Sequence, residues 1–273
     1  MHYRFPIALI LAALVLPTAT AAAPVCDRAR FHMLIDVGHT IDAPGATSAR
    51  GAPEYGFNFF LANQIERRLV AAGFTRADVM ITPGDKRLSL FARVAHANRS
   101  GADLLLSIHH DAVPDAFLDH WVYDGMALSY SDRFKGHSIF VSNRNADYQG
   151  SLAFARLLGE ALLKRGLRYT RHYTEAYMGR RRRELIDATA GVYRYDQLIV
   201  LERTQMPAVL LEAGSIVNRD EELAMLSEER QRLIADAVLD AADAFCALRT
   251  PLHPAPVARH APVRHAAAEG GGR

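Results

Sequence analysis

Three short apolar runs decide the fold: FHMLIDV (residues 31–37), DLLLSI (residues 103–108) and AVLL (residues 208–211). Each run is rich in Val, Ile or Leu, and longer stretches with the apolar spacing of helices separate them. Alternation of buried strands with amphipathic helices is typical of a mostly parallel sheet that has helices on both faces. The sequence therefore predicts a single α/β domain built on one central sheet.

The helices expected around this sheet cover residues 54–72, 86–100, 151–165 and 220–248, the last being one long or broken helix. Shorter strands are predicted at residues 79–82 and 137–141. Ser151 is the expected N-cap of the third helix. The side chains predicted to face the core are Phe57, Leu61, Ile65 and Leu69 in the first helix, and Leu88, Phe91, Val94 and Ala95 in the second.

Both ends of the chain depart from this pattern. Arg4, an apolar run at residues 6–16 and the small residues TATAAA (residues 18–23) predict a signal peptide over residues 1–23. The protein is therefore expected to be exported, to the periplasm or beyond the cell. Residues 250–273 are rich in Pro, Ala and Gly without a period, which predicts a disordered tail. Residues 24–249 suffice for one large domain, and no later apolar stretch predicts a membrane anchor.

The charge balance bears on the partners of the protein, and the two cysteines bear on how its ends are joined. Lys and Arg number 32 and Asp and Glu 30, a formal net charge of +2, so nucleic acid is not implied as a partner. The run of four arginines at residues 180–183 is interpreted as a solvated basic face in preference to a specific anion site. Cys26 and Cys246 form either a disulfide between the two ends of the domain or a pair of buried thiols.

Four residues that carry chemistry lie near the ends of predicted elements. His39 follows the first strand, His109 follows the run at residues 103–108, Glu212 ends the run at residues 208–211, and Glu54 opens the first helix. Because the carboxyl ends of parallel strands meet at one edge of a sheet, we expect these side chains to converge. Two imidazoles and a carboxylate suit a catalytic zinc ion with an open position. The sequence therefore predicts a zinc site at this edge.

Two neighbouring positions bear on this site. His110 competes with His109, because successive side chains of a strand point to opposite faces and the phase is not known from the sequence. Asp36, three residues before His39, either orients that histidine from behind or is a turn residue at the strand end.

The motifs IDVGHT (residues 35–40), GAPEYGFNFFLANQI (residues 51–65), LLLSIHHDA (residues 104–112) and MPAVLLEAGSIVN (residues 206–218) occur in this order. Together they resemble the zinc-dependent N-acetylmuramoyl-L-alanine amidases of the amidase-3 type, over about residues 31–247. The resemblance implies that His39, Glu54 and His109 bind zinc and that Glu212 is catalytic. It also implies hydrolysis of the bond between N-acetylmuramic acid and L-alanine in peptidoglycan or muropeptides.

The chain departs from the family pattern in the first motif, where Val37, Thr40 and Ile41 replace a proline and two glycines, and it lacks the aromatic residue common near Ser215. These changes affect the shape of the substrate groove and remove none of the four site residues. Two other functions remain open: a zinc peptidase acting on stem peptides or soluble muropeptides, and a peptidoglycan-binding protein without catalysis.

Two irregular connections, residues 113–136 and 168–197, are longer than ordinary loops, and loops of this length are usually functional or disordered. In the family that the chain resembles, such insertions can cover the zinc until a protein activator moves them. A gate of this kind would use Glu175, Glu184 or Glu202 as an additional contact to the metal.

Overall fold

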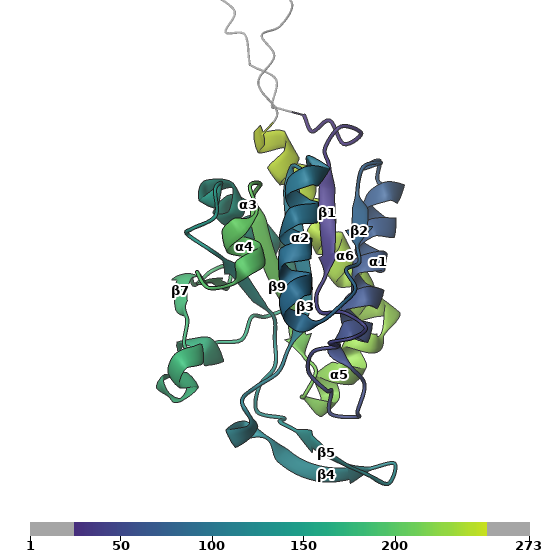
Figure 1. Ribbon diagram of the computed structural model, residues 1–273, viewed down its shortest axis with the longest axis vertical. Helices are drawn as coiled ribbons and strands as arrows, with labels where there is room; N and C mark the ends of the chain where they lie inside the picture. Colours follow the sequence, from purple (N-terminus) through teal and green to yellow (C-terminus); the bar gives the residue numbers. More distant parts are fainter. Residues whose placement is uncertain (1–24, 250–273) are drawn as a thin grey trace, which may run out of the picture.

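The computed structural model describes residues 25–249 (Figure 1). The predicted signal peptide and tail lie outside the described residues. The central sheet consists of β1 (Met33–Val37), β2 (Asp78–Met80), β3 (Leu104–Asp111), β6 (Ser138–Val141), β7 (Glu184–Asp187), β8 (Val192–Arg194) and β9 (Ala208–Ser215). Its seven strands run in the order β2-β1-β3-β9-β6-β8-β7.

Most neighbouring strands of this sheet are parallel. β1 pairs in parallel with both β2 and β3, β3 pairs in parallel with β9, and β6 pairs in parallel with β8. The β6–β9 and β7–β8 pairs are antiparallel. The prediction of a mostly parallel central sheet is confirmed, with the difference that one half of the sheet contains two antiparallel pairs.

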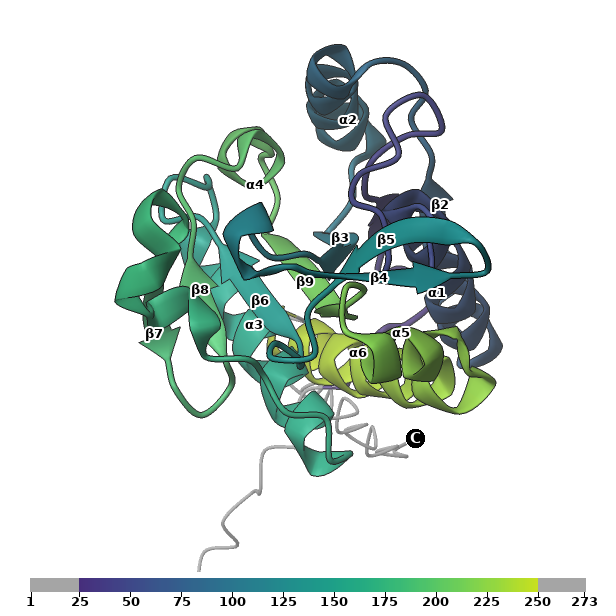
Figure 2. The same ribbon diagram turned by 90° about the horizontal axis from the view of Figure 1, so that it is seen from below.

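Helices cover both faces of the sheet, as predicted. They are α1 (Glu54–Ala71), α2 (Lys86–Ser100), α3 (Tyr148–Lys164), α4 (Ile199–Arg203), α5 (Arg219–Leu226) and α6 (Glu228–Arg249). Figure 2 shows α1, α3 and α6 on one side of the sheet and α2 and α4 on the other. The break between α5 and α6 falls at Ser227, so the last helical stretch is two helices.

Alternate residues of the central strands fill two separate cores, because successive side chains of a strand point to opposite faces. Ile35, Leu106 and Leu211 are buried against α1, α3 and α6. Leu61, Ile65 and Leu69 of α1 belong to the same core. Leu34, Leu105 and Leu210 are buried in the second core. Both faces of β1, β3 and β9 are therefore apolar, which explains why their sequences read as continuous apolar runs.

The predicted inner face of α2 is wrong. Leu88 is 68% exposed and Phe91 is 40% exposed, whereas the buried residues of this helix are Ser89, Arg93 and Ala97. The helix presents a polar, small-residue stripe to the sheet because Arg93 lies beside the buried carboxylate of Asp36. An arginine paired in this way takes the inward position that an apolar residue usually occupies.

Three other boundaries differ from the predictions. α3 begins one turn early, at Tyr148, because the side chain of Asp147 accepts a hydrogen bond from Gly150 N at 2.9 Å and caps the helix. Ser151 is not the N-cap; its hydroxyl accepts a hydrogen bond from the backbone N–H of Ala208 at the start of β9. β3 and β9 also continue past their apolar runs, so His109 and Glu212 lie within strands.

The two long connections contain regular structure, which the sequence analysis did not predict. Residues 113–136 include a hairpin of β4 (Asp119–Tyr123) and β5 (Met126–Tyr130), which projects from the lower end of the domain in Figure 1. Residues 168–197 contain two 3₁₀ helices, His172–Thr174 and Ala176–Arg181, together with β7 and β8.

Cys26 and Cys246 form a disulfide. It joins the start of the described chain to α6 and decides between the two possibilities that the sequence left open. Among residues 25–249, none of the helices has the length and apolar character that a membrane crossing requires.

Candidate active site

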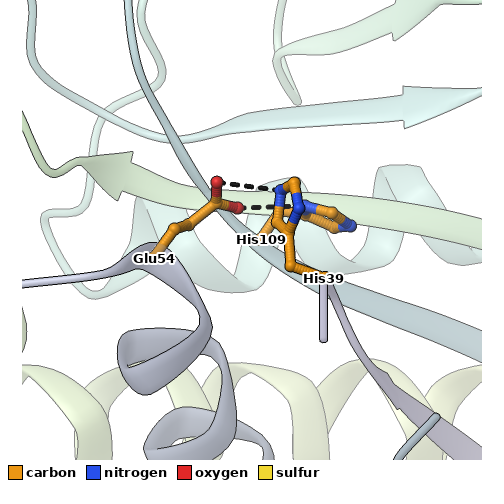
Figure 3. A group of neighbouring side chains, drawn as sticks. All are labelled: His39, Glu54 and His109. Carbon is orange, nitrogen blue, oxygen red and sulfur yellow. Dashed lines mark hydrogen bonds and ion pairs between the residues drawn. The ribbon is translucent and has the colours of Figure 1, made fainter. Parts of the chain in front are cut away.

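His39, Glu54 and His109 lie together at one edge of the sheet (Figure 3). One ligand atom from each residue fits within 4.8 Å of the other two. Glu54 Oε2 is 2.9 Å from His39 Nε2, and Glu54 Oε1 is 3.1 Å from His109 Nδ1. Three of the four residues that the sequence analysis selected thus converge, and they offer two nitrogens and a carboxylate to a metal ion.

The backbone around His39 permits this close approach. His39 itself has a φ of 66°, in the left-handed region that few residues other than glycine adopt. A Cβ atom at Gly38 would come within 2.4 Å of His109 Nε2, and one at Gly45 would come within 2.5 Å of Glu54 Oε2. Both positions therefore require glycine if the three side chains are to meet.

Glu54 is the first residue of α1 and is buried. Its oxygens accept hydrogen bonds from the backbone N–H groups of Ala46, at 3.1 Å, and His110, at 3.3 Å. Burial acts to raise the pKa of this carboxyl, but the hydrogen bonds with His109 and His39 outweigh it and hold the pKa well below its usual range. Glu54 is therefore ionised and fixed in the geometry of a ligand.

The structure decides between the two adjacent histidines. His109 faces Glu54, whereas His110 lies on the opposite face of β3, with its Nδ1 2.7 Å from Asn58 Oδ1. Burial lowers the pKa of His110 to about 3, so this ring is neutral. His110 therefore supports the core beneath α1, and His109 belongs to the site.

Glu212 faces the same space from the neighbouring strand. It is the register partner of His109 in the parallel β3–β9 pair, and both side chains line one cavity of about 660 Å³. Glu212 Oε2 is buried and has no hydrogen-bond partner. Burial, together with the charges of Asp111 and Glu54, raises the pKa of Glu212 well above its usual range. A carboxyl whose pKa is raised in this way holds a proton more readily than an exposed glutamate does, as a residue that must both accept and return a proton requires.

Asp36 acts on His39 through an intermediate residue. Its Oδ2 accepts a hydrogen bond of 2.6 Å from Ser107, and its Oδ1 lies 3.5 Å from Arg93 Nε. The guanidinium of Arg93 in turn donates a hydrogen bond to the backbone carbonyl of His39. Asp36 and Arg93 are both buried, so this connection fixes the turn that carries His39. The sequence analysis named Asp36 but missed Arg93, which its apolar pattern placed on the outside of α2.

The residues proposed for a gate lie elsewhere. Glu184 forms an ion pair of 2.9 Å with Arg194, and Glu202 lies 3.5 Å from Arg144. Glu175 is exposed between the two 3₁₀ helices. None of the three lines the cavity in the part of the chain that the structure describes. By contrast, Arg181 and Arg183 of the basic run do line it, so this run is more than a solvated face.

Comparison with known proteins identifies the family of this domain. Residues 33–244 match the family model Amidase_3, described as N-acetylmuramoyl-L-alanine amidase. The chain is 27% identical over 237 residues to the uncharacterized protein YqiI of Bacillus subtilis (strain 168), an alignment that covers 86% of this chain and 93% of that protein.

Solved structures of the family share the fold. The N-acetylmuramyl-L-alanine amidase Ami1 of Mycobacterium smegmatis superposes with a TM-score of 0.61 and 19% identity over 81% of this chain and 99% of Ami1. The CwlD amidase of Clostridioides difficile, solved in complex with the GerS lipoprotein, gives a TM-score of 0.54 and 18% identity over 80% of this chain and 99% of CwlD. Because the family model covers most of the described domain, the chain belongs to the N-acetylmuramoyl-L-alanine amidase family and hydrolyses the amide bond between N-acetylmuramoyl residues and L-alanine in peptidoglycan.

Proposed function

We propose that this amidase is a zinc enzyme in which His39, Glu54 and His109 hold the metal and Glu212 transfers the proton. The observation that carries the proposal is the convergence of these four side chains on one cavity, from the turn after β1 and from α1, β3 and β9. Two imidazoles and one carboxylate are a donor set of catalytic zinc sites, which keep one position open for water. The glycines at positions 38 and 45 support this assignment, since a Cβ at Gly45 would contact both His39 and Glu54 and a Cβ at Gly38 would contact the ring of His109.

A zinc ion in this position would lower the pKa of water and polarise the carbonyl of the scissile amide. The chain's own residues then account for the remaining steps. Glu212 Oε2 accepts the proton of the attacking water and delivers it to the departing nitrogen of L-alanine. The position of Glu212 on β9, opposite His109, keeps the carboxyl beside the reacting atoms in both steps. Arg93 and Asp36 hold the backbone of His39 in place.

The same proposal places the enzyme outside the cytoplasm. We assign residues 1–23 to a signal peptide, and the Cys26–Cys246 disulfide supports an oxidising compartment such as the periplasm. Residues 250–273 follow the catalytic domain as a tail. A protein activator is a further proposed partner, by analogy with the complex of CwlD and the GerS lipoprotein.

The proposal is tested with the purified mature protein, stripped of metal and then reloaded with zinc. Peptidoglycan is digested by the stripped form, the zinc form and a zinc-loaded Glu212→Gln variant, and the products are identified by mass spectrometry. We expect free stem peptides that begin with L-alanine only from the zinc form. Full activity of the stripped protein would refute the zinc assignment, and full activity of the variant would refute the role of Glu212.

A further inference from the structure

The arginine run, Arg180 to Arg183, covers the end of the second 3₁₀ helix and the two residues before β7, and part of it lines the active-site cavity. Arg181 and Arg183 line this cavity together with His109 and Glu212. Arg180 and Arg182 line a separate depression outside it, which Arg183 also borders. Arg181 therefore faces the cavity, Arg183 lies at the boundary between the cavity and the outer surface, and Arg180 and Arg182 lie outside the cavity. Two of the four positive charges face the space in which the substrate is cleaved.

These two arginines are held in place by backbone carbonyls and an aromatic ring, and not by ion pairs. Arg181 donates a hydrogen bond of 3.3 Å to the carbonyl of Ala112, and Arg183 donates bonds of 2.8 Å to the carbonyls of Arg180 and Arg182. The guanidinium of Arg183 also lies 3.6 Å from the ring centre of Tyr195. Within residues 25–249, neither arginine is within ion-pair distance of a carboxylate, and Arg183 Nε is buried without a hydrogen-bond partner.

The segment that carries the arginines is fixed to the floor of the cavity. The backbone N–H of Arg183 bonds to the carbonyl of Tyr173 at 2.8 Å, and the hydroxyl of Tyr173 bonds to Asp111 Oδ1, also at 2.8 Å. Tyr173 is buried against Phe140 of β6. Arg181 and Arg183 thus form a positively charged wall of the cavity, which is fixed in position beside the edge of the sheet that carries His109 and Glu212.

An anionic group of the substrate fits this wall. In a stem peptide, the residue after L-alanine is a glutamate whose α-carboxylate is free, one residue or about 4–7 Å beyond the scissile nitrogen. Ala112, which anchors Arg181, follows His109 by three residues, about 10 Å along an extended chain. The guanidinium of Arg181, which is held at Ala112, lies close enough for its charge to act on both Asp111 and Glu212. A planar guanidinium binds a carboxylate through two parallel hydrogen bonds.

We propose that Arg181 and Arg183 form a subsite for the free α-carboxylate of the second residue of the stem peptide. This inference rests on the proposed function, because it takes the scissile bond to lie between the zinc ligands and Glu212. The subsite would make the enzyme selective for stem peptides that carry a free acid at this position over those in which the same group is an amide.

The test compares two muropeptides that differ only at this group, MurNAc-L-Ala-γ-D-Glu-L-Lys and its D-isoglutamine form, as substrates of the zinc-loaded enzyme. We expect the wild type to have a KM about 10-fold or more lower for the free acid, with similar kcat values. Arg181→Met and Arg183→Met should raise the KM for the free acid by a similar factor and leave the amide nearly unchanged. Arg180→Met, which removes the same charge outside the cavity, is the matched control and should behave as the wild type.

Equal KM values of the wild type for the two substrates would overturn the subsite, as would variants that weaken both substrates alike. Calorimetric binding of the product peptide L-Ala-γ-D-Glu-L-Lys keeps this result separate from the catalytic roles. If the wild type binds the peptide and Arg181→Met does not, the subsite stands even where Glu212→Gln retains full activity. If neither the wild type nor the variants bind it, the subsite is rejected although the enzyme cleaves peptidoglycan.

Discussion

His109 and Glu212 are register partners on adjacent parallel strands, and the zinc-ligand candidate and the proton-transfer candidate therefore stand side by side on a rigid part of the sheet. Strand pairing through backbone hydrogen bonds fixes the distance between them independently of any loop. Sites built on strands in this way hold their geometry more accurately than sites built on loops. The relationship leads directly to the first prediction.

Glu212→Gln should lower the rate of amide hydrolysis by about 10³-fold, because general acid–base catalysis contributes roughly 10²–10⁴-fold. The amide side chain has the same size, so zinc content and melting temperature should stay close to those of the wild type. Zinc is measured by mass spectrometry of the metal, and hydrolysis by release of stem peptides. Glu160→Gln, on the exposed side of α3, is the control and should retain full activity.

Gly38→Ala should weaken zinc binding by at least 10-fold. The added methyl group would come within 2.4 Å of His109 Nε2 and 2.5 Å of the carbonyl oxygen of Ile108, so the imidazole must leave its present position beside Glu54. Zinc affinity is measured by competition with a chelating dye.

Gly56→Ala is the matched control, because nothing lies within 4 Å of a Cβ at this position of α1. It should leave zinc affinity unchanged and stabilise the protein by about 0.5–1 kcal/mol through its higher helix propensity. Unchanged zinc affinity in Gly38→Ala would mean that the packing of Gly38 against His109 is looser than the distances indicate.

Arg93→Met and Asp36→Asn should each destabilise the domain by about 3–5 kcal/mol, because each leaves a buried polar partner uncompensated. Both residues are almost fully buried, at 2% and 0% exposure. The double variant Asp36→Leu/Arg93→Met should recover much of this stability, since it removes both charges, yet it should still bind zinc more weakly because the carbonyl of His39 loses its donor. Urea unfolding and zinc titration measure the two effects separately, and full zinc affinity in the double variant would exclude a positioning role for Arg93.

The Cys26→Ser/Cys246→Ser variant should lower the free energy of unfolding by about 2–5 kcal/mol. The disulfide closes a loop with a sequence separation of 220 residues, and a cross-link of this length restricts the unfolded chain strongly. Urea denaturation of the wild type, with and without a reductant, gives the same comparison without mutation. If both measurements leave the midpoint unchanged, the cross-link has no net effect on stability and the docking of α6 alone holds the two ends together.

Much of the site could be predicted from the sequence, because it depends on local pattern. The strand that precedes His39 and the strands that contain His109 and Glu212 are apolar on both faces, so the sequence alone reveals their runs and the residues at or beyond their ends. What the sequence does not reveal depends on contacts between distant segments. Gly38 matters because of the ring of His109, and Arg93 is buried because of Asp36 on another element.

The structure of the long connection at residues 168–197 is harder to predict from the sequence for the same reason. β7 and β8 are short, and their edges carry charges such as the Glu184–Arg194 pair, so they lack the apolar alternation that predicts a strand. A run of four arginines likewise has no periodic signal that separates cavity-facing from outward side chains. Which of them face the active site depends on contacts with distant residues, such as the bonds to Tyr173 and Ala112.

His137 should make the stability of the domain depend on pH between about 4 and 6.5. Its ring is buried, neither ring nitrogen has a hydrogen-bond partner, and burial lowers the pKa to about 4. In the unfolded chain the pKa returns to about 6.5, so the unfolded state binds more protons than the folded state over this window. The contribution of His137 to the free energy of unfolding is complete above pH 6.5 and is lost as the pH falls toward 4.

Between pH 7 and pH 5 the free energy of unfolding of the wild type should therefore fall by about 2 kcal/mol more than that of His137→Phe, which keeps a ring but does not titrate. Urea unfolding of both proteins at the two pH values measures this difference, in which the shared titration of other groups cancels. Parallel losses in the two proteins would mean that His137 becomes protonated without unfolding the domain.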